Sequence, residues 1–246
     1  MIITSEYVDI PAEDSPMRLF VAAPKQAGRY PGIVFYSDIF QLTGPMLRSC
    51  ARLAGYGYVV AAPEIYHRRE PAGALIPFDD EGRTRGLEDA AQTPVAHFDS
   101  DCRATLGYLA AHPLVAPGKL GAAGFCLGGH LSFRAGLQPQ VRATVCFYGT
   151  GIHNGKLGKD ADAGSLQQAG QIKGELLLVW GTRDPHIPAE GRARIAAELG
   201  KAGVIFSQLL CDAEHAFMRD EGPRYEPQAT DQAFGEMVNF FQRIFA

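Results

Sequence analysis

The sequence predicts an α/β fold built on a mostly parallel sheet of eight strands, with helices on both faces. Short apolar runs alternate with amphipathic segments along most of the chain. Most of these runs are continuously apolar, as strands are when a parallel sheet is buried on both faces. The repeated order of strand, helix and strand is typical of a doubly wound sheet. A chain of 246 residues has the size of one such unit, so we expect a single domain over residues 1–246.

The strands are expected where the apolar runs lie. The first two should pair antiparallel, because only the turn-rich stretch PAEDSP separates them. The later runs are separated by segments long enough for helical crossovers, which parallel strands require. The expected strands cover residues 2–10, 17–23, 32–37, 58–63, 119–125, 142–149, 175–181 and 204–210.

Two helices can be identified from the spacing of their apolar side chains. One lies between the fourth and fifth strands, and its apolar face carries Phe98, Cys102, Thr105, Leu106 and Leu109. The other ends the chain, and its stripe carries Phe234, Met237, Val238, Phe241, Ile244 and Phe245. We expect this last helix to pack on the sheet and close the domain.

Two stretches, residues 64–95 and 151–174, show no clear period. Both are rich in glycine and charged residues. Long irregular segments inside a compact domain are usually functional loops or lids. Each follows the carboxyl end of a predicted strand, which is where open α/β sheets bind their ligands.

Composition narrows the class of protein. The net charge of −4 gives no general attraction to nucleic acid or to anionic membranes. The first residues lack the pattern of a signal peptide, and no apolar run is long enough to span a bilayer. Five cysteines without a CxxC pair argue against a disulfide framework or a zinc site. We therefore expect a cytoplasmic protein, a monomer or a small homo-oligomer.

The most informative local motif is GFCLGG at residues 124–129, which follows an apolar run and precedes a plausible helix. This is the pattern of a nucleophile elbow, with Cys126 where serine is commoner. Gly124 and Gly128 would leave room for a tight strand-to-helix turn, and the helix amino end would favour a thiolate. The N–H group of Leu127 would face a developing oxyanion. A glycine-rich turn that merely carries a buried cysteine is the alternative.

Two partners for Cys126 follow later strands. Asp184 comes just after the run at 175–181, and His215 comes just after the run at 204–210. Nucleophile, acid and histidine thus occur in the order expected of a catalytic triad on this kind of sheet. Asp212 lies nearer to His215 in sequence, but Asp184 stands at the end of the preceding strand. His186 is expected in a loop, or at most in the wall of a pocket.

The remaining histidines and cysteines have no partners at an informative spacing. His130 is expected on the surface or in the core of a helix. The other thiols are expected in the core: Cys50, Cys102, Cys146 and Cys211. No role is predicted for His67, His97, His112 and His153.

Most of the chain resembles the dienelactone hydrolase family, or carboxymethylenebutenolidases. GFCLGGH resembles its cysteine elbow, GTRDPHIP its aspartate loop and EHAFMR its histidine loop. FYSDIF, PEIYHR and FYGTGI are further family-like stretches. The resemblance implies an α/β-hydrolase fold and the opening of a small ester or lactone. It implies a Cys-His-Asp triad and a thioester acyl-enzyme, with no metal or cofactor.

The resemblance also implies residues beyond the triad. Asp38 matches the position of a family glutamate that holds the thiol, and the N–H of Ile39 would complete the oxyanion hole. Aspartate is one methylene shorter than glutamate, and the alternative is that Asp38 caps the next turn. In the family two arginines hold the substrate carboxylate.

Arg219, four residues after His215, matches one of these arginines. Arg83 and Arg85 both fit the other, and we favour Arg85. A guanidinium suits bidentate recognition of a carboxylate. The segment 151–174 is longer than usual for the family, which affects the expected shape of the pocket. The partner is thus expected to be a small ester or lactone that carries a carboxylate.

Two other classes remain open at this point. One is a non-catalytic relative that binds a ligand, against which an intact triad argues. The other is a redox-sensing cysteine protein, which the absence of a nearby resolving cysteine disfavours.

Overall fold

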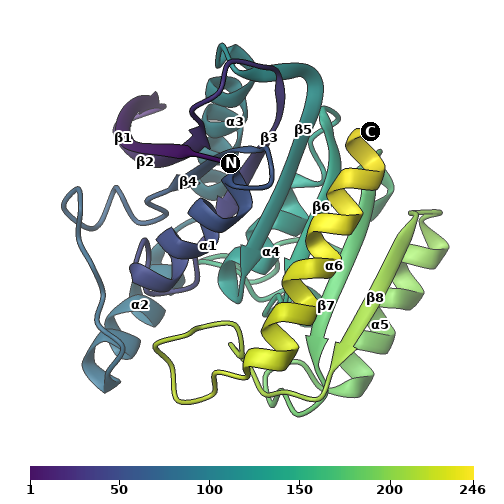
Figure 1. Ribbon diagram of the computed structural model, residues 1–246. Coiled ribbons are helices and arrows are strands. Elements are labelled where there is room, and N and C mark those ends of the chain that lie inside the picture. The colour runs from purple at the N-terminus through teal and green to yellow at the C-terminus, as the bar shows by residue number, and fades with distance from the viewer.

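All eight strands lie in one sheet, in the order β1-β2-β4-β3-β5-β6-β7-β8 (Figure 1). The structure, a computed structural model, describes residues 1–246. The strands are β1 (Ile3–Ala12), β2 (Ser15–Pro24), β3 (Tyr30–Tyr36), β4 (Val59–Pro63), β5 (Val115–Phe125), β6 (Val141–Phe147), β7 (Glu175–Gly181) and β8 (Phe206–Cys211). The predicted α/β-hydrolase fold with a mostly parallel eight-stranded sheet is confirmed.

Strand pairing also agrees with the sequence prediction. β1 pairs antiparallel with β2, β2 pairs antiparallel with β4, and every other pair is parallel. The largest difference in strand limits is at β5, which begins at Val115 rather than at residue 119. Pro117 and Gly118, the latter with a φ of +71°, interrupt the apolar run there, so its first residues do not look like a strand in the sequence.

Helices cover both faces of the sheet (Figure 1). α1 (Gly44–Ala54) and α6 (Pro227–Phe245) lie on one face. α3 (Val95–Ala111), α4 (Leu127–Ala135) and α5 (Ala189–Lys201) lie on the other. The two helices predicted from their apolar stripes are thus α3 and α6, and both are confirmed.

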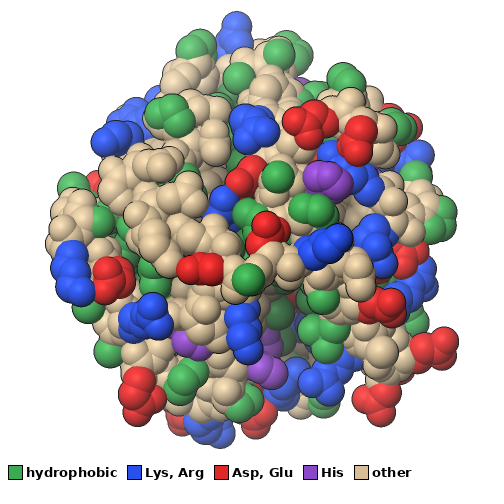
Figure 2. Space-filling view, turned by 180° about the vertical axis from the view of Figure 1, so that it is seen from behind, with side chains coloured by type: hydrophobic (Ala, Val, Ile, Leu, Met, Phe, Trp, Pro, Cys, Tyr) green, Lys and Arg blue, Asp and Glu red, His purple; other side chains and the backbone are tan.

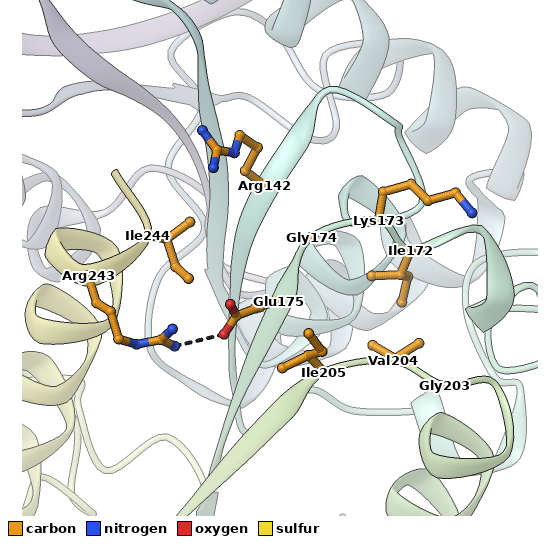
Figure 3. A pocket seen from close by; sticks show the side chains of 10 residues that line it. All are labelled: Arg142, Ile172, Lys173, Gly174, Glu175, Gly203, Val204, Ile205, Arg243 and Ile244. Atoms are coloured by element: carbon orange, nitrogen blue, oxygen red, sulfur yellow. Dashed lines mark hydrogen bonds and ion pairs between the residues drawn. The ribbon is translucent and has the colours of Figure 1, made fainter. Parts of the chain in front are cut away.

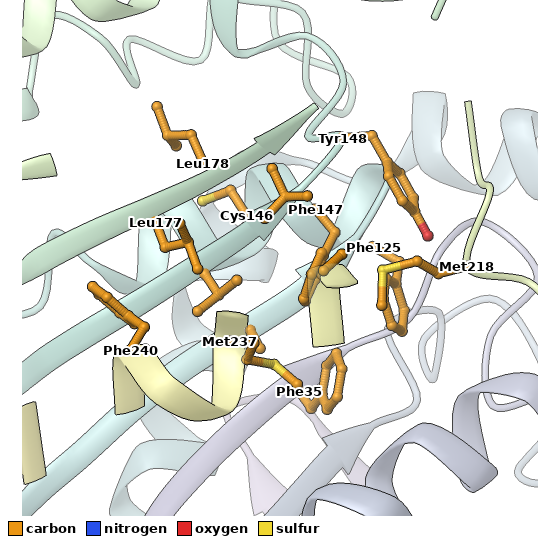
Figure 4. Close-up of a cluster of buried hydrophobic side chains, with 14 of the residues drawn as sticks. Phe35, Phe125, Cys146, Phe147, Tyr148, Leu177, Leu178, Met218, Met237 and Phe240 are labelled. Carbon is orange, nitrogen blue, oxygen red and sulfur yellow. The ribbon is translucent and has the colours of Figure 1, made fainter. Parts of the chain in front are cut away.

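The core consists of two buried apolar clusters, which lie on opposite sides of the sheet at β2, β3 and β4, and the larger of them also reaches α5. Leu19 and Val21 of β2 belong to one buried cluster, and the alternating Phe20 and Ala22 belong to the other. Figure 4 shows part of the larger cluster, where side chains of the central strands meet Met237 and Phe240 of α6. Burial on both sides explains why the strands read as continuous apolar runs.

One expectation for residues 64–95 is wrong: this irregular stretch contains a helix, α2 (Asp80–Gln92). Asp79 caps it, since its Oδ1 accepts a hydrogen bond of 2.7 Å from the N–H of Gly82. The inward face of α2 carries glycines rather than large apolar side chains. A Cβ built on Gly86 would lie 2.3 Å from the carbonyl oxygen of Ile39. A helix that packs through glycine leaves no apolar period in the sequence.

The second irregular stretch is irregular in the structure too. Residues 151–174 contain only two short 3-10 turns, η1 (Ile152–Asn154) and η2 (Ala169–Gln171). None of the helices combines the length and the apolar character that a bilayer crossing would need.

We predict that Gly86→Ala lowers the free energy of unfolding by about 1–3 kcal/mol, because the new methyl group would collide with backbone of the 38–42 turn. Gly107 is the matched control, since it lies on the exposed side of α3 with no atom within 4 Å of an added Cβ. Gly107→Ala should raise the same free energy by about 0.5–1 kcal/mol. Urea denaturation measures both; stabilisation by both substitutions would contradict the packing described.

Candidate active site

Cys126 lies in a strained turn between β5 and α4, with φ of 57° and ψ of −117°. Positive φ is costly for a residue with a side chain. The backbone around it is packed closely: a Cβ on Gly124 would lie 2.1 Å from Gly128 O, and one on Gly128 would lie 2.3 Å from Ser37 O. The turn therefore needs glycine at both positions, as the sequence motif predicts.

Backbone hydrogen bonds fix the position of Cys126. Its N–H donates to Phe147 O at 3.0 Å, and its carbonyl accepts from Gly129 N–H at 3.0 Å and Thr150 N–H at 3.2 Å. Cys126 is partly exposed, whereas the remaining thiols are buried. The core positions predicted for Cys50, Cys102, Cys146 and Cys211 are confirmed.

His215 and Asp184 form a buried hydrogen-bonded pair. Nδ1 of His215 donates to Oδ2 of Asp184 at 2.7 Å. Oδ1 of Asp184 accepts from the backbone N–H of His186 at 2.8 Å, which fixes the carboxylate. The rival Asp212 is exposed and instead pairs with Arg183 at 3.1 Å. His215 is thus bound by Asp184, not by Asp212.

The electrostatics of this pair favour a protonated imidazole. Burial lowers the pKa of His215, but the neighbouring Cys126 and the hydrogen bond to Asp184 outweigh it and raise that pKa to about 9. For Asp184 burial raises the pKa, yet the hydrogen bond and charge of His215 bring it below its ordinary value. The buried carboxylate of Asp184 thus favours the charged form of the imidazole.

Cys126 and His215 line one cavity of about 480 Å³, a size suited to a small molecule. Apolar side chains cover part of its wall, from Ile39, Phe40, Leu87, Leu127 and Leu157. Cys126 directly follows β5, so the cavity lies at the carboxyl ends of the parallel strands, which point towards the bottom of Figure 1. On the opposite view, histidine, lysine and arginine side chains gather around a hollow in the lower half of the molecule (Figure 2).

Two backbone N–H groups at this cavity are free to bind an oxyanion. Leu127 is the first residue of α4, where an N–H has no partner within the helix. The N–H of Ile39 makes no hydrogen bond in the structure. Both residues line the cavity, as Cys126 does.

Asp38 is bound to Arg219 and not to the thiol. Its Oδ2 accepts from Nη2 of Arg219 at 2.5 Å and from Nε at 3.2 Å. Its Oδ1 accepts from Phe40 N–H at 2.9 Å, which is the capping alternative raised for this residue. The short side chain of aspartate keeps the carboxylate near its own turn, within reach of Arg219.

Two aromatic rings contact Arg219 in addition to its ion pair with Asp38. Its guanidinium lies 4.6 Å from the ring centres of both Phe40 and Phe78. Stacking of this kind fixes a guanidinium plane. One edge of Arg219 is thus taken by Asp38, while the residue still lines the cavity.

The preference for Arg85 is not supported by the structure. Arg83 lines the cavity, whereas Arg85 forms an ion pair with Glu70 outside it. Both lie on α2, and residues two apart on a helix point about 200° apart. Only one of the two can therefore face the cavity.

The sequence does not predict three of the residues that line the cavity, His153, Lys156 and Arg224. A fourth, His186, lies in the pocket wall, which was one of the two places expected for it. They lie on the loops that follow β6, β7 and β8. The ring of His186 meets that of His215 edge-on at 4.7 Å. No signal in the sequence separates Lys156 from the exposed Lys159 on the same loop, because both are isolated cations in an aperiodic segment.

A second cavity, of about 470 Å³, lies at the opposite end of the sheet (Figure 3). Its charged residues include Glu175, which binds Arg243 at 2.8 Å, and it contains no nucleophile. No group of three or more His, Cys, Asp or Glu side chains is placed to hold a metal ion.

Comparison with known proteins places this site in context. A model of the dienelactone hydrolase family matches residues 17–245. The chain belongs to the dienelactone hydrolase family. This membership puts it among the hydrolases of carboxylic esters and lactones and confirms the family resemblance of the three loops.

Relatives match along most of their length. The "putative carboxymethylenebutenolidase" of Saccharomyces cerevisiae is 36% identical, over 99% of this chain and 93% of the yeast protein. The carboxymethylenebutenolidase of Pseudomonas sp. strain P51 is 28% identical, over 88% of this chain and 86% of its own. A "putative dienelactone hydrolase" of Klebsiella pneumoniae has the same fold, with a TM-score of 0.87, 24% identity and coverage of 99% and 100%.

We predict that Cys126→Ala lowers the pKa of His215 from about 9, because the substitution removes a neighbouring group that raises this pKa while the burial that opposes charge remains. The pKa can be followed by NMR titration of the imidazole resonances. Cys211→Ala is the control, since that buried thiol does not contribute to the shift in the pKa of His215. An unchanged His215 pKa in the Cys126 variant would mean that the two groups do not interact.

Proposed function

We propose that this hydrolase opens a small ester or lactone through covalent attack by Cys126, with His215 and Asp184 as its partners. The observation that carries the proposal is the buried 2.7 Å hydrogen bond between His215 and Asp184, beside a cysteine held in a strained turn. The same cavity is lined by cysteine and histidine. A nucleophile, a base and a residue that orients the base are the parts that covalent acyl transfer requires.

In the first half of the reaction the sulfur of Cys126 attacks the acyl carbon. The carbonyl oxygen becomes an oxyanion, which accepts hydrogen bonds from the N–H groups of Leu127 and Ile39. The intermediate then collapses: the bond to the leaving oxygen breaks and His215 gives that oxygen its proton. The products are a thioester on Cys126 and an alcohol or enol, which stays tethered when the substrate is a lactone.

In the second half water hydrolyses the thioester. His215, now neutral, takes a proton from the attacking water, while Asp184 stabilises the imidazolium that forms. The second oxyanion uses the same two N–H groups. Its collapse releases the carboxylic acid and restores the thiolate of Cys126. Because a thiolate is also a good leaving group, an activated ester or lactone fits this site better than an amide.

For the substrate, we propose a carboxylate bound by Arg219 and Arg83. Both line the cavity that holds Cys126. Asp38 acts here as a positioning residue for Arg219, since its carboxylate binds one edge of that guanidinium. The rings of Phe40 and Phe78 also contact this guanidinium and restrict its position.

Alkylation tests the nucleophile. Iodoacetamide should modify Cys126 faster than any other cysteine and abolish hydrolysis at the same rate, because the other thiols are buried and burial raises their pKa, that of Cys102 to about 12. Peptide mass spectrometry locates the label. Cys126→Ser should reduce kcat/KM for aryl esters by roughly a hundredfold or more, since a hydroxyl is not activated by an ion pair with His215. Labelling spread over several cysteines with activity retained would refute the assignment.

Specificity tests the arginines. Arg219→Met and Arg83→Met should each lower the preference for an acidic over a neutral aryl ester by roughly tenfold, the value of a charge-assisted hydrogen bond at the lower end of its range. Arg85→Met is the matched control, because Arg85 pairs with Glu70 outside the cavity. The measurement is the ratio of kcat/KM values for the two esters. An equal loss for both esters in the Arg219 variant would assign that residue a role in loop structure.

A further inference from the structure

The permanently charged side chains that line the catalytic cavity are all basic. Its basic residues are Arg83, Lys156, Arg219 and Arg224, and no aspartate or glutamate lines it. Only one of the four, Arg219, has a carboxylate partner in the structure, which is Asp38. A single substrate carboxylate would leave much of this positive charge without a partner.

The acidic residues of the loop after His215 point away from the cavity. Asp220 and Glu221 both bind Arg48 of α1, at 2.6 Å each. The same loop supplies Arg219 and Arg224 to the cavity wall. On this loop Asp220 and Glu221 therefore face away from the cavity, whereas Arg219 and Arg224 line it.

The backbone on either side of Arg224 is fixed. Gly222 N–H donates to Arg219 O at 2.9 Å, and Glu226 N–H donates to Phe217 O at 3.0 Å. The turn that carries Arg224 is thus tied to the segment that carries Arg219. Arg224 itself is half-buried at the cavity wall, so its charge is held there and does not lie free in solvent.

Lys156 lies at the rim of the cavity on the loop after β6, and its side chain is exposed. Leu157, its neighbour, is buried, and Lys159 N–H donates to Thr93 O at 2.9 Å. The nearby carboxylate of Asp160 accepts from Val95 N–H at 2.8 Å. The carboxylate of Asp160 is thus bound to the backbone, and Lys156 forms no ion pair with a carboxylate.

Nearby positive charges contribute to a lowered pKa at two histidines of the cavity. The pKa of His186 is lowered, first by desolvation and then by the charges of His215, Arg224 and Arg83, against which Asp184 acts in the other direction. The pKa of His153 is lowered by burial and by Arg194 and Lys156. The cavity therefore carries a positive potential before any substrate enters.

We propose that Lys156 and Arg224 recognise a second anionic group, so that the natural substrate is an ester or lactone with two acidic groups. This inference rests on the proposed function and specifies its substrate class. One anionic group would lie at Arg219 and Arg83, and the other would meet Lys156 and Arg224. The carbon skeleton between them would contact the apolar part of the wall, such as Leu157 and Leu87.

The test compares 4-nitrophenyl esters that differ only in acyl charge. The acyl groups are acetate, glutarate with one free carboxylate, tricarballylate with two, and an analogue with one carboxylate and one phosphonate. The wild-type enzyme should prefer the doubly acidic esters to the glutarate ester by roughly tenfold in kcat/KM. Comparison of the last two esters identifies whether the second group is a carboxylate or a phosphonate-like group.

The decisive variant is Lys156→Met combined with Arg224→Met. It should reduce the preference for doubly over singly acidic esters by about tenfold or more. Lys159→Met is the matched control, because Lys159 is exposed on the same loop and does not line the cavity; it should keep the wild-type preference. A wild-type enzyme without preference, or a double variant that retains it, overturns the inference.

A second readout separates this inference from the mechanism. The monoamides of glutarate and tricarballylate, which carry one and two free carboxylates, are compared as protectants of Cys126 against iodoacetamide, which measures binding without turnover. The tricarballylate monoamide should protect at a lower concentration than the glutarate monoamide, and the double variant should remove that difference. Absence of hydrolysis with this protection pattern intact would refute the proposed reaction alone, whereas equal protection by both acids would refute the second anionic group.

Discussion

The turn at Cys126 is the constraint on which the rest of the site depends. Its positive φ is maintained because Gly124 and Gly128 allow backbone segments of β3, β5 and α4 to touch without side chains between them. The same turn leaves the Leu127 N–H at the bare end of α4. Through its carbonyl, Cys126 also holds Thr150, which begins the long loop after β6. Strain at one residue is thus supported by the whole centre of the sheet.

The ion pair of Asp38 with Arg219 decides how charge is divided in the cavity. Because Asp38 is occupied by Arg219 and by the N–H of Phe40, the imidazole of His215 is the group that can stabilise a thiolate. Arg219, in turn, has a fixed orientation before substrate arrives. Preorganised charges of this kind lose less free energy on binding than flexible ones.

Much of this architecture can be predicted from the sequence, and the failures have physical causes. Strands buried on both faces and the apolar stripe of α6 leave strong patterns in the sequence. The positions of the elbow, Asp184 and His215 can be predicted because each comes directly after a strand. The sequence does not reveal helix α2, because this helix packs through Gly86. Without that helix, nothing in the sequence shows which of Arg83 and Arg85 points into the cavity. Lys156 and Arg224 lie on loops whose path depends on long-range contacts, which no local pattern records.

The two loops that border the cavity are joined at Thr93, where α2 ends. Its carbonyl accepts the N–H of Lys159 at 2.9 Å, and a Cβ on Gly158 would lie 2.3 Å from the same oxygen. Val95, which begins α3, is tied to Asp160 of the same loop. These contacts fix the two segments relative to each other, so a change in the length of one loop would also displace the other.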